Sequence, residues 1–381
     1  MLKNVMLKKV LKISIFKLFS ALNIFIKKNN NIILLYSANG GINFNLLPLK
    51  NYLIKEGYSK NYKIYCGVNS KKFFNYEDDV IYLNKVQSFL LFFKAKYVFY
   101  TTGQIPIKPS VDQLVIQLHH GITFKNTGAK TKINNGDEHF FTFCVGSSEL
   151  YKSIYSQSFN CFPCNVLVNS EPMTDLFFEK HIKHCKKEKI VIWTPTFRQS
   201  NYLGYSDSNY VQLLPLFKNN DYEELNSVLH KLNIKLLVKI HPAQDLSLYK
   251  NLVFSNLKIY SSSDFDKKYD NLYKKLCESD ALVADYSSLT LQYLLLDKPI
   301  CYVIPDLENY KNLRGFALNP PEDFMPGPKI INKEQFYRFL KDISNNVDSY
   351  VSQRNIVKSL VHKYSDGKSC KRLIEFCGLK K

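Results

Sequence analysis

The chain has 381 residues, of which 45% are hydrophobic, and its 52 Lys and Arg outnumber its 33 Asp and Glu, giving a formal net charge of +19. This size predicts two domains with separate cores, and the positive charge favours anionic partners such as phosphates, nucleic acids or acidic lipids. No apolar run reaches the roughly 18 to 20 residues of a membrane-spanning helix. The nine cysteines are scattered and no secretory signal is evident, which argues against a disulfide framework and for a reduced, cytosolic setting.

Residues 1–28 have the pattern of a basic amphipathic helix. Leu, Val, Ile and Phe recur at helical spacing, with seven lysines and no acidic residue among them. This pattern is typical of a helix that lies in the membrane interface beside anionic lipids. A first helix that packs into the core of a domain has a similar pattern, and the sequence leaves both alternatives open.

The next part of the chain alternates apolar runs with turns and helical stretches. A strand is predicted at residues 31–36, followed by a turn with Gly40 and Gly41 and by a helix that continues to Lys55. Further strands are predicted at residues 63–68, 96–100, 113–118 and 142–146. Their continuous apolar character is typical of a parallel α/β sheet covered on both faces.

A second series of elements follows a basic segment. Residues 179–189 are rich in Lys and His without periodicity, which predicts a linker between domains. The predicted strands after it are residues 189–194, 234–240, 257–260, 281–285 and 299–304, with helices at 222–232, 267–278 and 287–296. Two such series predict two Rossmann-like α/β domains that face a cleft. We expect a surface helix at residues 1–28, a first domain at 29–180 and a second at 181–381.

Ligands of open parallel sheets bind beyond the carboxyl ends of the strands, so polar residues at those ends are candidate site residues. His119 and His120 follow the strand at 113–118, and a histidine there can take a proton from an attacking hydroxyl near neutral pH. His241 follows the strand at 234–240 and can donate a hydrogen bond to a diphosphate or a ribose.

Two more strand ends carry residues suited to phosphate. Asp285, Ser287 and Ser288 lie where the strand at 281–285 meets a helix, and hydroxyls and free amides at a helix start bind phosphate. A serine at this position is equally well explained as an ordinary N-cap. Thr196 and Arg198 follow the strand at 189–194, where a guanidinium can hold a phosphate in bidentate fashion.

These segments resemble the CDP-glycerol glycerophosphotransferase family, whose members build teichoic acids and related polyol-phosphate capsules. Residues 119–128 (HHGITFKNTG) are similar to the family's Trp-His-Gly segment, which places His120 on the motif histidine. Residues 194–198 (TPTFR) and 239–242 (KIHP) resemble two more motifs. In residues 284–328, Asp-Tyr-Ser-Ser, Lys-Pro-Ile, Asp-Leu-Glu-x-Tyr, Arg-Gly-Phe and Pro-Gly-Pro follow one another in the family order.

The resemblance implies a GT-B-like fold, with the acceptor bound by the first domain and the nucleotide donor by the second. It implies a catalytic pair in which His120 is the base and Asp285 orients its neighbours, since an ordinary carboxylate is a weak base near pH 7. The implied donor-binding residues are Thr196, Arg198, His241, Ser287, Ser288 and Arg314, and the implied acceptor-binding residues are His119 and Lys125. The sequence departs from the family at Met173 (usually Arg), Gln292 (usually Asp) and His119 (usually Trp), which puts the acceptor and the polyol in question.

The implied reaction moves glycerol phosphate from CDP-glycerol to a hydroxyl of a cell-surface polymer or its lipid-linked precursor, with release of CMP. It would take place at the cytoplasmic face of the membrane, with the protein bound peripherally. A CDP-ribitol-dependent transferase and a GT-B nucleotide-sugar glycosyltransferase are alternatives, and a noncatalytic polyanion- or membrane-binding module is a different class. The sequence has no metal-site, cofactor or nucleic-acid-binding signature, so we expect no resident metal, cofactor or specific nucleic acid.

Overall fold

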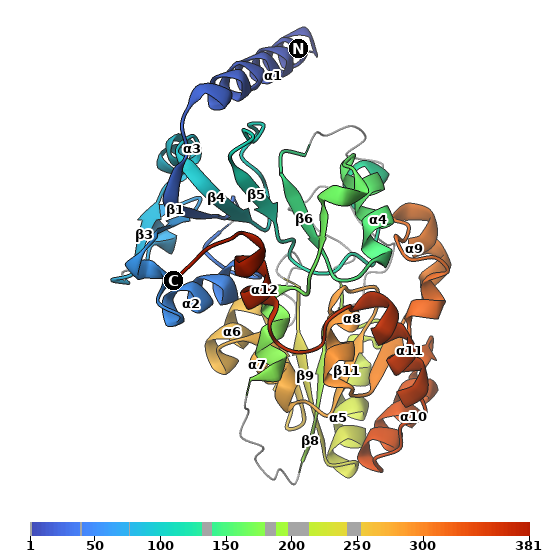
Figure 1. Cartoon of the computed structure of the whole chain (residues 1–381). Coiled ribbons are helices and arrows are strands. Elements are labelled where there is room, and N and C mark those ends of the chain that lie inside the picture. The colour runs from blue at the N-terminus through green and yellow to red at the C-terminus, as the bar shows by residue number, and fades with distance from the viewer. Residues whose placement is uncertain are drawn as a thin grey trace. The chain divides into compact units, whose positions relative to one another are not determined.

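The computed structural model describes residues 2–38, 40–75, 77–131, 139–179, 188–196, 213–241 and 253–381, with side chains from residue 14 onward. Two compact α/β units form within the chain (Figure 1). The first comprises Met1–His120, Asn134–Asp175 and Lys363–Lys381, and the second comprises Gly121–Ile133 and Leu176–His362.

These units differ from the predicted domain limits in three respects. The first 28 residues belong to the first unit, Gly121–Ile133 belongs to the second, and the last segment of the chain returns to the first. Sequence periodicity reports only neighbours along the chain, so it does not reveal segments that cross from one unit to the other. Most of the predicted linker, residues 180–187, lies outside the described residues.

The first unit is built on a parallel sheet. Within the described residues it has seven strands in the order β3-β2-β1-β4-β5-β6-β7, and every strand pair is parallel. The strands are β1 (Asn29–Tyr36), β2 (Lys63–Gly67), β3 (Val80–Leu83), β4 (Ala95–Tyr100), β5 (Leu114–Gln117), β6 (Phe143–Gly146) and β7 (Val166–Val168). The helices are α1 (Leu2–Phe25), α2 (Leu46–Lys55), α3 (Lys85–Phe92), α4 (Leu150–Phe159) and α12 (Ser369–Phe376). All five strands predicted in this part are confirmed.

Helices cover both faces of this sheet because successive strand residues point to opposite sides. Ile33 and Leu35 of β1 belong to a core that includes Leu49 of α2 and Leu373 of α12. Leu34, between them, belongs to a second core on the other face, with the end of α3. The carboxyl edge of the sheet is left for loops.

The predicted first helix forms, but its amphipathic character is not confirmed, since apolar residues are only weakly segregated around α1 as a whole. Its end is held on the first unit. The Phe19 ring lies 5.3 Å from the Phe89 ring, and Asn23 Nδ2 donates to the Gln113 side chain at 3.0 Å. Large apolar side chains on the rest of this helical end are exposed, namely Ile15, Leu18, Leu22, Ile24 and Phe25. In the described part of the chain, no helix is both long enough and apolar enough to cross a bilayer.

The second unit has its own parallel sheet, with six strands among the described residues in the order β10-β9-β8-β11-β12-β13. The strands are β8 (Lys189–Trp193), β9 (Ile234–Lys239), β10 (Leu257–Tyr260), β11 (Ala281–Ala284), β12 (Ile300–Val303) and β13 (Lys329–Ile330). The helices are α5 (Tyr222–Lys231), α6 (Ser262–Tyr269), α7 (Leu272–Glu278), α8 (Leu289–Tyr293), α9 (Leu307–Leu313), α10 (Lys333–Ser344) and α11 (Val351–Val361). The helix predicted at 267–278 is in fact two, because Asp270 adopts φ +63° between α6 and α7.

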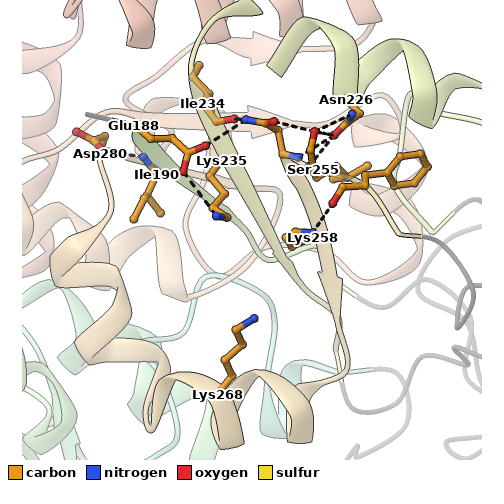
Figure 2. Close-up of polar contacts among 12 residues, drawn as sticks. Glu188, Ile190, Asn226, Ile234, Lys235, Ser255, Lys258, Lys268 and Asp280 are labelled. Atoms are coloured by element: carbon orange, nitrogen blue, oxygen red, sulfur yellow. Dashed lines mark hydrogen bonds and ion pairs between the residues drawn. The ribbon is translucent and has the colours of Figure 1, made fainter. Parts of the chain in front are cut away.

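Polar side chains hold the amino-terminal edge of this sheet (Figure 2). Asn226 of α5 accepts hydrogen bonds from the backbone N–H groups of Asn256 and Leu257 at 2.8 and 3.1 Å. Asp280 accepts another from the N–H of Ile190 at 2.7 Å. These bonds pair the first backbone groups of β10 and β8, so polar residues at this edge have a structural role.

Candidate active site

In the sheet of the second unit, the side on which the chain adds new strands reverses between β8 and β11. From β8 the chain adds β9 and β10 on one side, then returns to add β11, β12 and β13 on the other. In open parallel sheets this reversal creates a crevice outside the carboxyl ends of the two central strands, where ligands bind. The residues that follow β8 and β11 are therefore the centre of the candidate site.

Asp285 joins the ends of these two strands. It follows β11 directly and is 1% exposed. Its Oδ2 accepts a hydrogen bond of 2.9 Å from the backbone N–H of Thr196, and its Oδ1 accepts one from the Thr196 hydroxyl. A buried carboxylate that accepts bonds at both oxygens fixes the loop after β8, which is an orienting role.

Ser287 and Ser288 directly precede α8 and are partly exposed. Ser287 Oγ accepts a hydrogen bond from the N–H of Leu289 at 3.3 Å, so Ser287 acts as a helix cap. Ser288 makes no capping bond through its side chain. Its Oγ lies instead against Gly121, only 2.5 Å from the position that a Cβ would take there. With φ at +152°, Gly121 also has a backbone conformation that other residues rarely adopt.

The segment after Gly121 packs beside α9. The N–H of Asn126 donates to the Gly315 carbonyl at 3.1 Å, and the N–H of Ala317 donates to the Phe124 carbonyl at 3.0 Å. Lys125 Nζ lies 5.6 Å from the centre of the Tyr310 ring, within the range of a cation–π interaction. Residues 121–126 and the Arg-Gly-Phe motif, far apart in the sequence, are thus neighbours in this unit.

Arg314 lies at the end of α9 beside this pairing. Its backbone N–H donates to the Tyr310 carbonyl at 2.9 Å, which fixes its position. Its side-chain Nε is buried and has no hydrogen-bond partner in the part of the chain that the structure describes. An unpaired buried donor is costly, so this guanidinium is suited to an anionic ligand.

The two adjacent histidines have different surroundings. His120 is exposed, with its ring 5.8 Å from the Phe44 ring, and it is bonded directly to Gly121. His119 is buried, stacks on Phe159 at 5.0 Å and lies 4.6 Å from Tyr155. Burial lowers the pKa of His119 to about 3, so it stays neutral. This placement indicates a packing role and does not support the predicted contact of His119 with an acceptor.

The remaining predicted residues are less closely gathered. His241 is exposed just beyond the carboxyl end of β9, the strand next to β8. Arg198 lies outside the described residues. The structure therefore brings together Thr196, Asp285, Ser287 and Ser288, places Lys125 and Arg314 on neighbouring segments, and puts His241 at an adjacent strand end. Among the described residues, no group of three or more His, Cys, Asp or Glu could hold a metal ion.

Two residues that were not among the predicted site residues also shape this region. Tyr286 stacks on Tyr310 at 4.1 Å and donates to Asp306 Oδ1 at 2.8 Å, so the Asp-Tyr-Ser-Ser motif is fixed to α9. Asn45 Nδ2 donates to the carbonyls of Leu118 and His119, both at 2.9 Å, and holds the loop before His120. The only sequence signal for Asn45 is its position before a predicted helix.

Two parallel sheets, one of them with polar residues gathered at its switch point, define an α/β protein of the GT-B-like class. Residues 18–377 match the family described as CDP-Glycerol:Poly(glycerophosphate) glycerophosphotransferase. The chain belongs to this family, which confirms the resemblance seen in its motifs.

Known relatives and structures agree with this assignment. The chain is 29% identical over 375 residues to the teichoic acid ribitol-phosphate polymerase TarL of Staphylococcus aureus (strain NCTC 8325 / PS 47), a match that covers 92% of this chain and 62% of TarL. It is 28% identical over 240 residues to the teichoic acid glycerol-phosphate primase of Bacillus subtilis (strain 168), covering 61% of this chain and 56% of the primase. The chain thus spans less than two thirds of these relatives. The structure of the wall teichoic acid polymerase TagF matches it with a TM-score of 0.71 at 18% identity, covering 92% of this chain and 89% of that one.

Proposed function

We propose that this protein transfers glycerol phosphate from CDP-glycerol to a hydroxyl of a cell-surface polymer or its lipid-linked precursor, with release of CMP. The family description supports the donor. The observation that carries the proposal is the packing of Gly121 against Ser288, because it joins the His-Gly motif to the switch point of the second sheet. His120 precedes Gly121, so chain connectivity keeps it next to this point.

In the proposed reaction, the donor diphosphate is bound by Ser287, Ser288 and His241, with Arg198 and Arg314 as cations. Thr196 lines the same strand end. The acceptor hydroxyl loses its proton to the His120 imidazole as its oxygen attacks the β-phosphorus in line. A new P–O bond forms, the bond from that phosphorus to the bridging oxygen breaks, and CMP departs with the electron pair. Lys125 contributes positive charge for an acceptor that itself carries phosphate.

CDP-ribitol is the second candidate donor. It is favoured by the similarity to TarL, a ribitol-phosphate polymerase, which extends over 92% of this chain. The second sheet would bind the cytidine diphosphate part in the same way for either polyol, so the two donors differ only in the group that is transferred.

A donor screen tests the proposal. The full chain is incubated with an oligomeric polyol-phosphate acceptor and with CDP-glycerol, CDP-ribitol or a nucleotide sugar in turn, and products are weighed by mass spectrometry. We expect CMP release and an acceptor heavier by one or more glycerol phosphate units. An acceptor that gains mass only with CDP-ribitol would establish the second candidate. An acceptor that gains mass with the nucleotide sugar would establish a glycosyltransferase. Binding of polyanions without CMP release would indicate a noncatalytic module.

Replacement of Gly121 by Ala should reduce kcat/KM for the preferred donor by about 10²-fold, since small displacements at a reacting centre have effects of this size. The added Cβ would meet Ser288 Oγ at 2.5 Å and Ser288 Cβ at 3.2 Å, so the hydroxyl must turn away and the contact must widen slightly, and φ +152° strains any side chain at this position. Gly378→Ala is the matched control, because Gly378 has φ +69° but no atom within 4 Å of the added Cβ. The control should lose stability without loss of specific activity. Full activity in Gly121→Ala would contradict the proposed site.

We also propose that α1 docks the protein peripherally on the cytoplasmic face of the membrane. Ile15, Leu18, Leu22 and Phe25 recur at spacings of three and four residues and are between 46% and 84% exposed. This spacing gathers them on one side of the helical end, beside Phe19, which packs on the first unit. Lys17 and Lys27 nearby are exposed and suit anionic lipids.

Replacing Leu18, Leu22 and Phe25 by Ser should lower the fraction of protein that floats with anionic vesicles by about 10-fold. The variant lacks three apolar side chains that would insert into the membrane interface. The matched control is Ile356→Ser with Leu360→Ser, two side chains of α11 that are 62% and 51% exposed. The control should float like the unchanged protein. Equal flotation of both variants would rule out α1 as the docking element.

A further inference from the structure

Asn45 directly precedes α2 in the first unit, and its side chain is buried, with only 1% of the residue exposed. An asparagine in this place usually caps the helix, because its side-chain oxygen accepts a hydrogen bond from a free N–H of the first turn. Within the described residues, Asn45 makes no such capping bond. Its buried amide therefore has a role other than starting the helix.

The Asn45 amide joins three segments of the first unit. Its Nδ2 donates to the carbonyls of Leu118 and His119, both at 2.9 Å, and less closely to Glu171 Oε1 at 3.3 Å. Its Oδ1 accepts a hydrogen bond of 2.9 Å from the backbone N–H of Met173. A flipped amide would lose all of these bonds, so they fix the orientation of the side chain and tie the segments after β5 and β7 to the start of α2.

One of these bonds fixes the backbone that carries His120. The carbonyl of His119 belongs to the same planar peptide unit as the N and Cα atoms of His120, so holding this carbonyl sets the position of the His120 Cα. His119 has φ +58°, and a strained conformation of this kind persists only where its surroundings hold it. The bond from Asn45 and the stacking of the His119 ring on Phe159 at 5.0 Å supply that support.

The residue before Asn45 contacts the His120 ring itself. The Phe44 ring lies 5.8 Å from the His120 ring and is inclined to it by 59°. Phe44 has φ +47°, which is a genuine outlier for a bulky residue, and it is 39% exposed. Strained residues cluster at functional sites. One loop thus contacts His120 in two ways, through the Phe44 ring and through the bond from Asn45 to the preceding carbonyl.

We infer that Asn45 is a positioning residue for the His120 imidazole. It acts by fixing the backbone before His120, so that the ring stands beside Phe44 in one place. This inference rests on the proposed function, because it takes His120 as the base for the acceptor hydroxyl. A base must lie within hydrogen-bond reach of the proton that it takes, so a displaced imidazole slows the transfer without weakening the binding of the donor.

Replacing Asn45 by Ala should lower kcat with the preferred CDP-polyol and a soluble acceptor by about 30-fold, less than the loss of the base itself, and leave KM for the donor unchanged. Asn23→Ala is the matched control. Asn23 is also buried in the first unit, and its Nδ2 donates to the Lys108 carbonyl at 2.9 Å and to Gln113 Oε1 at 3.0 Å, before the opposite end of β5 from His120. Both variants should be less stable to urea, but the control should keep its kcat.

A second variant and a second background separate positioning from a general structural effect. Asn45→Asp keeps the bond from Met173 but places an oxygen opposite the two carbonyls, and it should show the same loss of kcat as Asn45→Ala. In a His120→Ala background, Asn45→Ala should change kcat by less than about 2-fold, because the imidazole through which Asn45 acts is missing. An equal loss in both backgrounds would overturn the inference, as would a normal kcat in Asn45→Ala when His120→Ala is slow.

Nuclear magnetic resonance of the protein with isotope-labelled histidine separates failure of this inference from failure of the proposed function. The His120 Cε1–H signal is identified by its absence from His120→Ala. It should be the same in the unchanged protein and in Asn23→Ala, and shifted or broadened in Asn45→Ala, where the backbone before the ring is no longer held. An unchanged signal in Asn45→Ala would overturn the positioning role whatever the activity. A shifted signal together with a normal kcat in His120→Ala would keep Asn45 as the residue that positions His120 and overturn His120 as the base.

Discussion

Replacing His120 by Ala should lower kcat with the preferred CDP-polyol by about 10³-fold, the usual contribution of a general base, and leave the affinity for CDP unchanged. His120 is exposed and next to Gly121, so its imidazole is open to an acceptor hydroxyl, whereas the neighbouring His119 is enclosed by aromatic rings. The measurement is CMP release under saturating donor and acceptor, with CDP binding followed by calorimetry.

Three further measurements separate a base from a structural residue. His230→Ala, at an exposed position on α5, is the matched control and should retain full activity. Added imidazole should partly restore His120→Ala, because the vacated position is open to solvent. In the unchanged enzyme, the rate should fall at acid pH because the His120 imidazole becomes protonated and can no longer act as the base. The rate of His120→Ala should not show this fall. A variant with normal kcat, or one that loses CDP affinity in proportion to its rate, would reject the assignment.

The strands at the centre of both sheets could be predicted because they are buried on both faces. Runs such as residues 31–36 and 234–240 are continuously apolar, and the structure contains a strand at each. β3, β7 and β13 escaped prediction because they are only four, three and two residues long and are partly exposed, so their sequences carry little signal. In the structure each of them pairs with a predicted strand, β3 with β2, β7 with β6 and β13 with β12.

In the candidate site, sequence analysis could predict only the residues that directly follow a predicted strand. Thr196 and Asp285 were found because each follows an apolar run, and the structure joins them by two hydrogen bonds. The packing of Gly121 on Ser288 and of Lys125 on Tyr310 depends on contacts between distant segments, which periodicity does not report. The histidine pair shows the same limit. His119 has φ +58° and is enclosed by Tyr155 and Phe159 of α4, contacts between segments that periodicity does not report.

Replacing Asp285 by Ala should lower kcat/KM by about 10²-fold and the free energy of unfolding by about 1–3 kcal/mol, because the N–H and hydroxyl of Thr196 would both lose their partner in a buried setting. Asp323→Ala, at an exposed position, is the matched control and should change neither quantity. Stability is measured by urea denaturation and activity by CMP release.

Asp285→Asn separates an orienting role from a chemical one. The asparagine oxygen can accept the hydrogen bond from the Thr196 N–H, and its amide can donate to the Thr196 hydroxyl oxygen, so both contacts are kept with one reversed in direction. We therefore expect Asp285→Asn to retain most of the activity and stability that Asp285→Ala loses. If Asp285 instead took a proton or balanced a charge during the reaction, the amide would be as inactive as alanine although the protein remained stable. That outcome would move Asp285 from positioning the loop after β8 to taking part in the transfer itself.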